Sequence, residues 1–155
     1  MTPRKIRGPA ERMRGYARVR EARCPQTTAD RLRELAGDEI VPVRLYTAHN
    51  FTAPPDVLLR LASDEEIHVR WAVLLNPAAD EATLRSLAEW ERATKADRPG
   101  WPPAFVRGLA VHHPGAPAAL HAELLAERVC GCPRKCDTRE VWQRRLARVR
   151  AAGWR

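Results

Sequence analysis

Residues 58–77 contain a set of landmarks that also occurs 26 residues earlier in the chain. Four pairs match at this offset: Leu61-Ala62 with Leu35-Ala36, Asp64 with Asp38, Val69-Arg70 with Val43-Arg44, and Asn76 with Asn50. Self-similarity at a period between about 20 and 50 residues is typical of small supersecondary units that stack on one another. The sequence therefore predicts an array of helical units.

Each unit carries the signals of two short helices. In the first unit, Thr27 or Thr28 can cap a helix over residues 29–36, and a second helix follows Pro42, which suits a first helical turn because it has no N–H to satisfy. The next unit repeats these signals. Helices this short are unstable alone in water, so burial between neighbouring units must hold them in place.

The period breaks once, after the third unit has begun. The next Val-Arg pair stands 37 residues after its predecessor, so about 11 extra residues lie within residues 90–103. Insertions in repeat proteins map to loops on one face, which is often the binding face. We therefore predict that this loop binds a partner through Trp90, Arg98 and Trp101. In the alternative interpretation, Trp90 extends the preceding helix and Trp101 covers the core.

The net charge of +8 is concentrated at the two ends of the chain. Residues 1–24 carry 8 Arg and Lys against 2 Asp and Glu, and residues 127–155 carry 9 against 3, whereas the middle carries 10 against 14. Basic segments bind phosphates and so favour nucleic acid as an alternative partner. The arginines that would make these contacts lie near the end of the chain: Arg139, Arg144, Arg145 and Arg148.

One arginine recurs in every unit. Arg44 follows Asp38 by six residues, as Arg70 follows Asp64. We predict that stacking pairs these arginines with acids of adjacent units, because a partly buried arginine is normally paired. The alternative is a phosphate-binding stripe formed by Arg18, Arg44, Arg70 and Arg107. Asn50 and Asn76 end their units, where a side-chain amide can satisfy backbone groups of a turn.

Three cysteines lie close together near the C-terminal end: Cys130, Cys132 and Cys136. Their thiolates can converge on zinc or an iron–sulfur cluster, although such sites usually have four protein ligands. They could equally be free thiols. The fourth ligand could come from a second chain or from one of these residues: Cys24, His112, His113, His121 or Asp137.

Residues 24–44, NFTAPPDVLLRLASDEEIHVRWAVLLNPAADEATLRSLA (residues 50–88) and AFVRGLAVHHPGAP (residues 104–117) resemble the leucine-rich repeat variant family, whose repeats are similar in style to HEAT repeats. The resemblance covers about residues 17–126. It implies an all-α fold, a short right-handed α-solenoid of about four repeats in which α and 3₁₀ helices alternate. Some family members also join an iron–sulfur segment to the N-terminal end of the repeats, whereas the cysteines here lie at the other end.

These observations divide the chain into three parts. We predict a basic arm over residues 1–16, the repeats over residues 17–126 with the loop at 90–103, and a cysteine-containing basic segment over residues 127–155 that ends in an amphipathic helix. No apolar run is long enough to span a membrane, and the basic N-terminus lacks the apolar segment of a secretory signal. We therefore expect a soluble, cytoplasmic protein.

The sequence contains no recognisable set of catalytic residues. It has no Gly-rich phosphate loop and no paired carboxylates or nucleophile–base pair at a motif spacing. We therefore predict a non-catalytic scaffold that binds a protein partner. A nucleic-acid-binding solenoid, or a metal- or iron–sulfur-containing redox sensor, are the alternatives.

Overall fold

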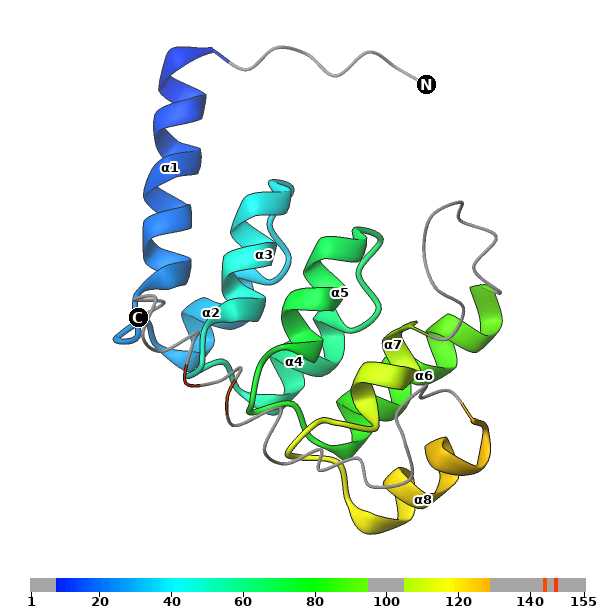
Figure 1. Cartoon of the computed structure of the whole chain (residues 1–155). Coiled ribbons are helices and arrows are strands. Elements are labelled where there is room, and N and C mark those ends of the chain that lie inside the picture. Colours follow the sequence, from blue (N-terminus) through cyan, green and yellow to red (C-terminus); the bar gives the residue numbers. More distant parts are fainter. Residues whose placement is uncertain (1–7, 95–104, 129–143, 145–146, 148–155) are drawn as a thin grey trace.

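The structure is a computed structural model that describes residues 8–94, 105–128, 144 and 147. Within these residues it is all-helical, with no strand, as the sequence predicts (Figure 1). The helices are α1 (Pro9–Arg23), α2 (Ala29–Leu35), α3 (Val41–His49), α4 (Pro55–Leu61), α5 (Ile67–Leu74), α6 (Glu81–Thr94), α7 (Phe105–Ala110) and α8 (Ala118–Ala126). None of these described helices combines the length and the apolar composition needed to cross a bilayer.

The helices follow one another across the molecule in two rows: the odd row, made of α1, α3, α5 and α7, and the even row, made of α2, α4, α6 and α8. In the odd row, α1 packs on α3, α3 on α5, and α5 on α7 (Figure 1). In the even row, α4 packs on α6, and even helices pack on the odd helices next to them in sequence. Among the described helices, the contacts therefore join elements that are close in sequence.

The local sequence signals explain where these helices begin. The Thr28 hydroxyl caps α2 by accepting a hydrogen bond from the backbone N–H of Arg31 at 3.3 Å. Pro42 lies in the first turn of α3, and Pro55 is the first residue of α4. The predicted helix starts in the first two units are therefore confirmed.

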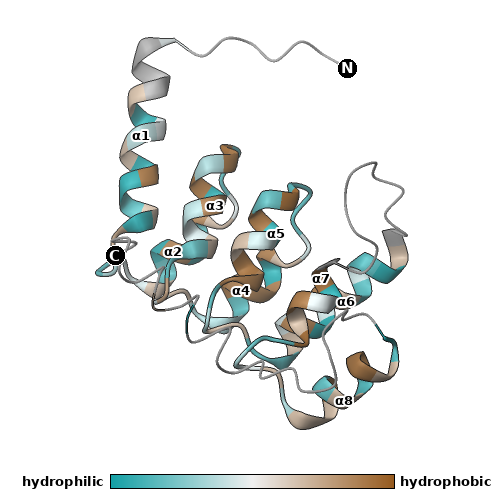
Figure 2. Cartoon of the chain, viewed as in Figure 1, coloured by the Kyte–Doolittle hydropathy of each residue, from teal (hydrophilic) through white to brown (hydrophobic). Residues whose placement is uncertain are grey.

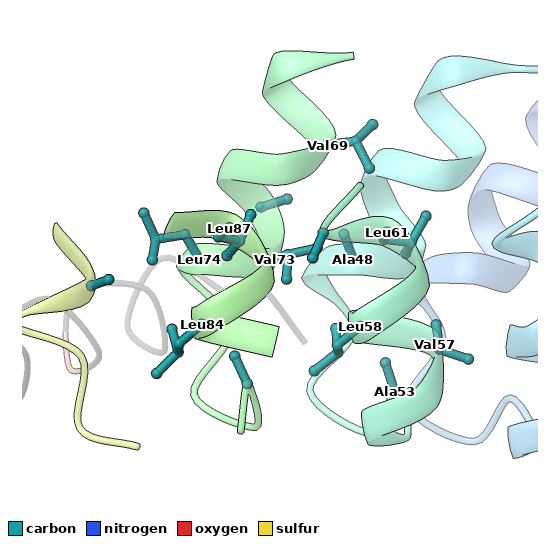
Figure 3. Packing of buried hydrophobic residues seen from close by; sticks show 14 of the residues in the cluster. Ala48, Ala53, Val57, Leu58, Leu61, Val69, Val73, Leu74, Leu84 and Leu87 are labelled. Atoms are coloured by element: carbon teal, nitrogen blue, oxygen red, sulfur yellow. The ribbon is translucent and has the colours of Figure 1, made fainter. Parts of the chain in front are cut away.

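Leucines of the even row provide much of the core. A pair of leucines three or four residues apart is fully buried in each even helix and repeats along the row, as Figure 3 shows for the middle of the molecule. These leucines are Leu32 and Leu35, Leu58 and Leu61, Leu84 and Leu87, and Leu120 and Leu124. Burying one such side chain contributes about 1.5–3 kcal/mol, which the short helices could not obtain alone.

The same backbone turn ends each helix of the odd row. In all four turns an N–H donates to the carbonyl oxygen three residues earlier, at 3.0 or 3.1 Å. The donors are Thr27, Ala53, Ala79 and Ala116, and the acceptors are Cys24, Asn50, Asn76 and His113. The turn after α1 thus has the same bond as the later three, and Cys24 takes the place of the repeating asparagine.

The structure corrects three expectations about the elements. Helix α1 begins at Pro9, so residues 9–16 of the predicted arm are helical. The described residues contain no 3₁₀ segment, so the predicted alternation of α and 3₁₀ helices is wrong. Helices α2 and α4 each have seven residues, nearly two α-helical turns, and this geometry places both leucines of a pair on one side of the helix. Helix α6 continues through Trp90 to Thr94, so the chain at Trp90 is not a loop. The predicted C-terminal helix lies outside the described residues apart from Arg144 and Ala147, which are helical.

Candidate binding surface

The recurring arginines of α1 and α3 are bonded within the framework. Arg18 pairs with Asp38 at 2.6 Å, and Arg44 makes a two-pronged contact with Asp64 at 2.7 and 3.0 Å. Each acid also accepts a hydrogen bond from the backbone at the start of the following odd-row helix. The predicted ladder is confirmed here, and it joins the guanidinium of one unit to a helix N-terminus in the next.

The third step of the ladder has a different chemistry. The ladder joins an arginine to the residue 20 positions further on, and for Arg70 that residue is Trp90. The Arg70 guanidinium carbon lies 3.4 Å from the centre of the Trp90 ring, and Arg70 is 2% exposed. An indole face attracts a cation and shields it from water. Trp90, predicted to contact a partner, instead extends α6, as the alternative interpretation proposed, and it covers a framework arginine, which neither interpretation foresaw.

Glu91 of α6 caps the start of α7, the role that Asp38 and Asp64 have at the starts of α3 and α5. Its carboxylate is 6% exposed and accepts hydrogen bonds from the backbone N–H of Val106 at 2.7 Å and of Arg107 at 2.9 Å. The Arg107 side chain also pairs with Glu91 at 3.0 Å and with Glu127, 20 positions further on. Arg18, Arg44, Arg70 and Arg107 thus all have partners within the protein, which leaves no phosphate-binding stripe on them.

Side chains at the end of each odd-row helix form a second, buried ladder. Asn50 donates to the carbonyl of Cys24 at 3.0 Å and Asn76 to that of Asn50 at 2.9 Å. His113 continues the series, because its Nε2 lies 3.0 Å from the carbonyl of Asn76 and its Nδ1 accepts from the Gly115 N–H at 2.9 Å. This imidazole therefore carries its proton on Nε2. Burial lowers the pKa of His113, which keeps the ring neutral.

The structure does not bring the predicted metal ligands together in the part that it describes. Cys24 is half-buried, and its Sγ lies 3.0 Å from Oε1 of Gln26. His113 belongs to the second ladder, and no group of three or more potential ligands occurs among the described residues. The cysteines at 130, 132 and 136, and Asp137, lie outside those residues, so the metal site stays a prediction.

Two other sets of predicted contacts fall largely outside the described residues. Arg98 and Trp101 belong to the undescribed segment between α6 and α7. Of the arginines predicted to bind nucleic acid, Arg144 is described as helical and exposed, while the others at 139, 145 and 148 are not described. Both sets of contacts therefore stay predictions.

A surface of the odd row, which sequence reasoning missed, combines aromatic, histidine and arginine side chains. On α1, Glu21 pairs with Arg31 of α2 and marks the side that faces the even row, whereas Tyr16, Arg20 and Arg23 share another side. Most of the corresponding positions of the later helices are partly or fully exposed, although Ala72, the counterpart of Arg20 and Tyr46 on α5, is buried. We name this surface the aromatic face; its described residues are Tyr16, Arg20, Arg23, Leu45, Tyr46, His49, His68, Trp71, Leu109 and His112.

The aromatic face is continuous between α1 and α3. The guanidinium carbon of Arg23 lies 5.1 Å from the centre of the Tyr46 ring, which joins the two helices. Figure 2 shows mostly hydrophilic colours on the coloured part of α1 and more hydrophobic colours on α4. The signal for this face was present in the sequence, since aligning the units places Tyr16, Pro42 and His68 at one position, but exposure was needed to separate it from the core.

Comparisons with known proteins give no relative from which a function could be transferred. Protein-family models, curated proteins and solved structures were searched, and none of them matches this chain.

Proposed function

We propose that the protein is a non-catalytic helical-repeat scaffold that binds a protein partner through the aromatic face. In this proposal the described helices are a short right-handed α-solenoid of about four units, of the leucine-rich repeat variant or HEAT-like kind. The recurrence of the backbone turn, of the buried leucine pairs and of the asparagine–histidine ladder supports it. Repeat arrays of this kind commonly use an extended face for binding.

The observation that carries the proposal is that one set of side chains is bonded inside the framework and another set is exposed on the odd row. The recurring arginines, acids and asparagines are used internally, whereas the aromatic and aliphatic side chains of the aromatic face keep exposed surface even where they also pack against the core. Tyr16 is 66% exposed, and Leu45, Tyr46 and Trp71 are partly exposed. Aromatic residues and arginine are enriched in protein–protein interfaces because they bury large surfaces and retain polar groups.

The resolved pKa shifts of the described carboxylates come from the ion pairs and hydrogen bonds that hold the framework together. Hydrogen bonds from arginines lower the pKa of Glu21, Asp56, Glu123 and Glu127, and a hydrogen bond from His68 lowers the pKa of Glu66. These shifts stabilise the charged carboxylates. A general acid at neutral pH would instead need a raised pKa.

The test is capture of partners from a lysate of the cells that make the protein, using wild type, the double variant Tyr16→Ala/Tyr46→Ala and the control Leu59→Ala. Leu59 is a 42% exposed leucine of α4, away from the aromatic face, so its variant removes exposed apolar surface elsewhere on the protein. We expect the same partner to be retained by wild type and control and reduced at least about tenfold by the double variant. Equal capture by all three folded proteins would remove the aromatic face from the proposal.

A further inference from the structure

We propose that the α1 end of the aromatic face binds an acidic segment of the partner protein. This inference rests on the proposed scaffold function and adds the chemistry of the bound segment. It is carried by the exposed side chains of α1 and by the charges around them.

Four exposed residues follow one another along one side of α1. Met13, Tyr16, Arg20 and Arg23 are spaced by three, four and three positions, which places them in one stripe of a helix. Met13 is 67% and Tyr16 is 66% exposed, which makes them the most exposed large apolar residues described. A helix that packs on its neighbours by one side has thus kept apolar surface in water on another.

The two arginines of this stripe are available to a ligand. Arg20 makes no ion pair within the described part of the chain, and Arg23 makes none there either, although it lies over the Tyr46 ring. Arg18, on the same helix, is instead bound to Asp38. Glu21 does not neutralise the stripe, because its carboxylate is bonded to Arg31.

The chemistry of the stripe suits carboxylates flanked by apolar side chains. A guanidinium binds a carboxylate through two parallel hydrogen bonds, and residues three apart on a helix are neighbours, so Arg20 and Arg23 can hold two acidic side chains of one segment. The ring of Tyr46 lies under Arg23, and Tyr16 is one helical turn before Arg20, so the two rings offer contact to an apolar side chain between the acids.

Charge also determines the end of the face at which the segment binds. Glu65 is 89% exposed just before α5, so its carboxylate presents negative charge at that edge of the odd row even though one oxygen lies 3.5 Å from Arg44. Like charges repel an acidic segment from this edge. The α1 stripe, with Tyr46 next to it, is the remaining part of the face that carries arginine.

A nucleic acid is a poorer match for the stripe. Its affinity comes from many phosphate contacts, each neutralised by a lysine or arginine. The arginines that could lengthen such a row, Arg44 on α3 and Arg70 on α5, are buried and bonded inside the framework. Two accessible arginines are enough for a short acidic peptide.

The experiment measures binding to the full chain by fluorescence anisotropy at low and at physiological salt. The probes are a short labelled peptide of glutamates interrupted by tryptophan, the same peptide with glutamine in place of every glutamate, and a single-stranded DNA of the same length. We expect the glutamate peptide to bind at least about tenfold more tightly than the glutamine peptide and the DNA. We expect Arg20→Ala/Arg23→Ala to remove that preference.

The matched control is Arg14→Ala/Arg60→Ala, which has the same net charge and also removes two exposed arginines that make no ion pair among the described residues. It should bind the glutamate peptide like wild type. Equal binding of the two peptides, tighter binding of DNA, or equal losses in both arginine variants would overturn the proposal. A partner that Tyr16→Ala/Tyr46→Ala loses but Arg20→Ala/Arg23→Ala retains would leave the scaffold function standing and reject only acidic recognition.

Discussion

At the scale of single residues, His113 shows how two different side chains can fill one structural role. Like Asn76, it accepts a hydrogen bond from the backbone N–H two residues ahead and reaches the carbonyl of the previous unit. Gly115 permits this close packing, because a Cβ added to it would lie 2.6 Å from the carbonyl oxygen of Ala79. The histidine differs from the asparagine in that it can take up a proton.

We predict that His113 makes the stability of the protein depend on pH. Burial lowers its pKa from the ordinary 6.5, so below that pH the unfolded chain binds a proton that the folded chain resists. The free energy of unfolding should therefore fall as pH falls below about 6.5, by at most about 1.4 kcal/mol per pH unit from this group. His113→Asn should reduce this slope, as measured by urea unfolding between neutral and mildly acidic pH. Parallel curves of unfolding free energy against pH for the two proteins would contradict the prediction. Burial also lowers the pKa of His49, so the variant should keep a smaller slope from that residue.

The Arg44–Asp64 pair provides a second test at this scale. The two side chains are 10% and 7% exposed, so removing the arginine leaves a nearly buried carboxylate without its counter-charge. Arg44→Met should lower the free energy of unfolding by about 3 kcal/mol, and the added change Asp64→Asn should recover part of the loss. Both are measured by urea unfolding.

The control is the exposed pair of Arg33 and Asp56, whose side chains are 46% and 57% exposed. Arg33→Met should cost less than about 1 kcal/mol, because water screens an exposed pair. A cost for Arg44→Met no larger than that of Arg33→Met would show that the ladder contributes little to stability.

At the scale of helices, α6 compensates for the change in period. It continues beyond the length of α2 and α4, and its last turns place Trp90 over Arg70 and Glu91 at the start of α7. One helix thus supplies both a cover for the preceding arginine and a cap for the following helix. These two roles belong to a single aspartate in the regular units.

We predict that Trp90→Ala lowers the free energy of unfolding by about 2 kcal/mol, because it removes the ring that shields a 2% exposed guanidinium. Trp90→Phe should retain part of this, since a smaller aromatic face still attracts the cation. Urea unfolding measures the loss, and NMR should show the Arg70 side-chain N–H signal moving away from the position that a stacked indole causes. An unchanged Arg70 signal in Trp90→Ala would contradict the proposed stacking.

The helices and the ladders could be predicted where the period of 26 residues is regular. Leu58, Asp64 and Asn76 have counterparts at the same offset, and the structure gives each the packing or bonding that the repeat implies. The role of Trp90 could not be fixed, because an aspartate was replaced by a residue of different chemistry. The aromatic face was missed for another reason, since Tyr46 and Trp71 have the same helical spacing as core residues and pack against the core, so only their partial exposure distinguishes them.

At the scale of the whole molecule, the described helices form a linear array in which contacts join near neighbours. Helices α4 and α5 have packed helices on both sides, whereas α1 has none before it among the described residues. The stability of such an array is approximately a sum of units and of the interfaces between them. The middle and the end of the protein should therefore differ in local stability.

We predict that native-state hydrogen exchange is slowest for amides of α4 and α5 and fastest for the first two turns of α1. The reason is that opening the end of α1 breaks contacts on one side only, whereas opening α5 breaks those with α3, α4, α6 and α7. Exchange is measured by mass spectrometry at neutral pH. Equal protection of all helices would instead mean that the protein opens as a single cooperative unit.

In the second ladder, the number of residues between one member and the next can vary. Asn50 and Asn76 are 26 residues apart and Asn76 and His113 are 37 apart, yet the same carbonyl-to-side-chain contact joins each pair. The contact between the side chain of one turn and the carbonyl of the previous turn repeats from unit to unit, while the chain between the two turns can lengthen. The junction between α6 and α7 is therefore the natural place to graft a foreign peptide or a reporter into this protein, because the extra residues enter between two fixed attachment points.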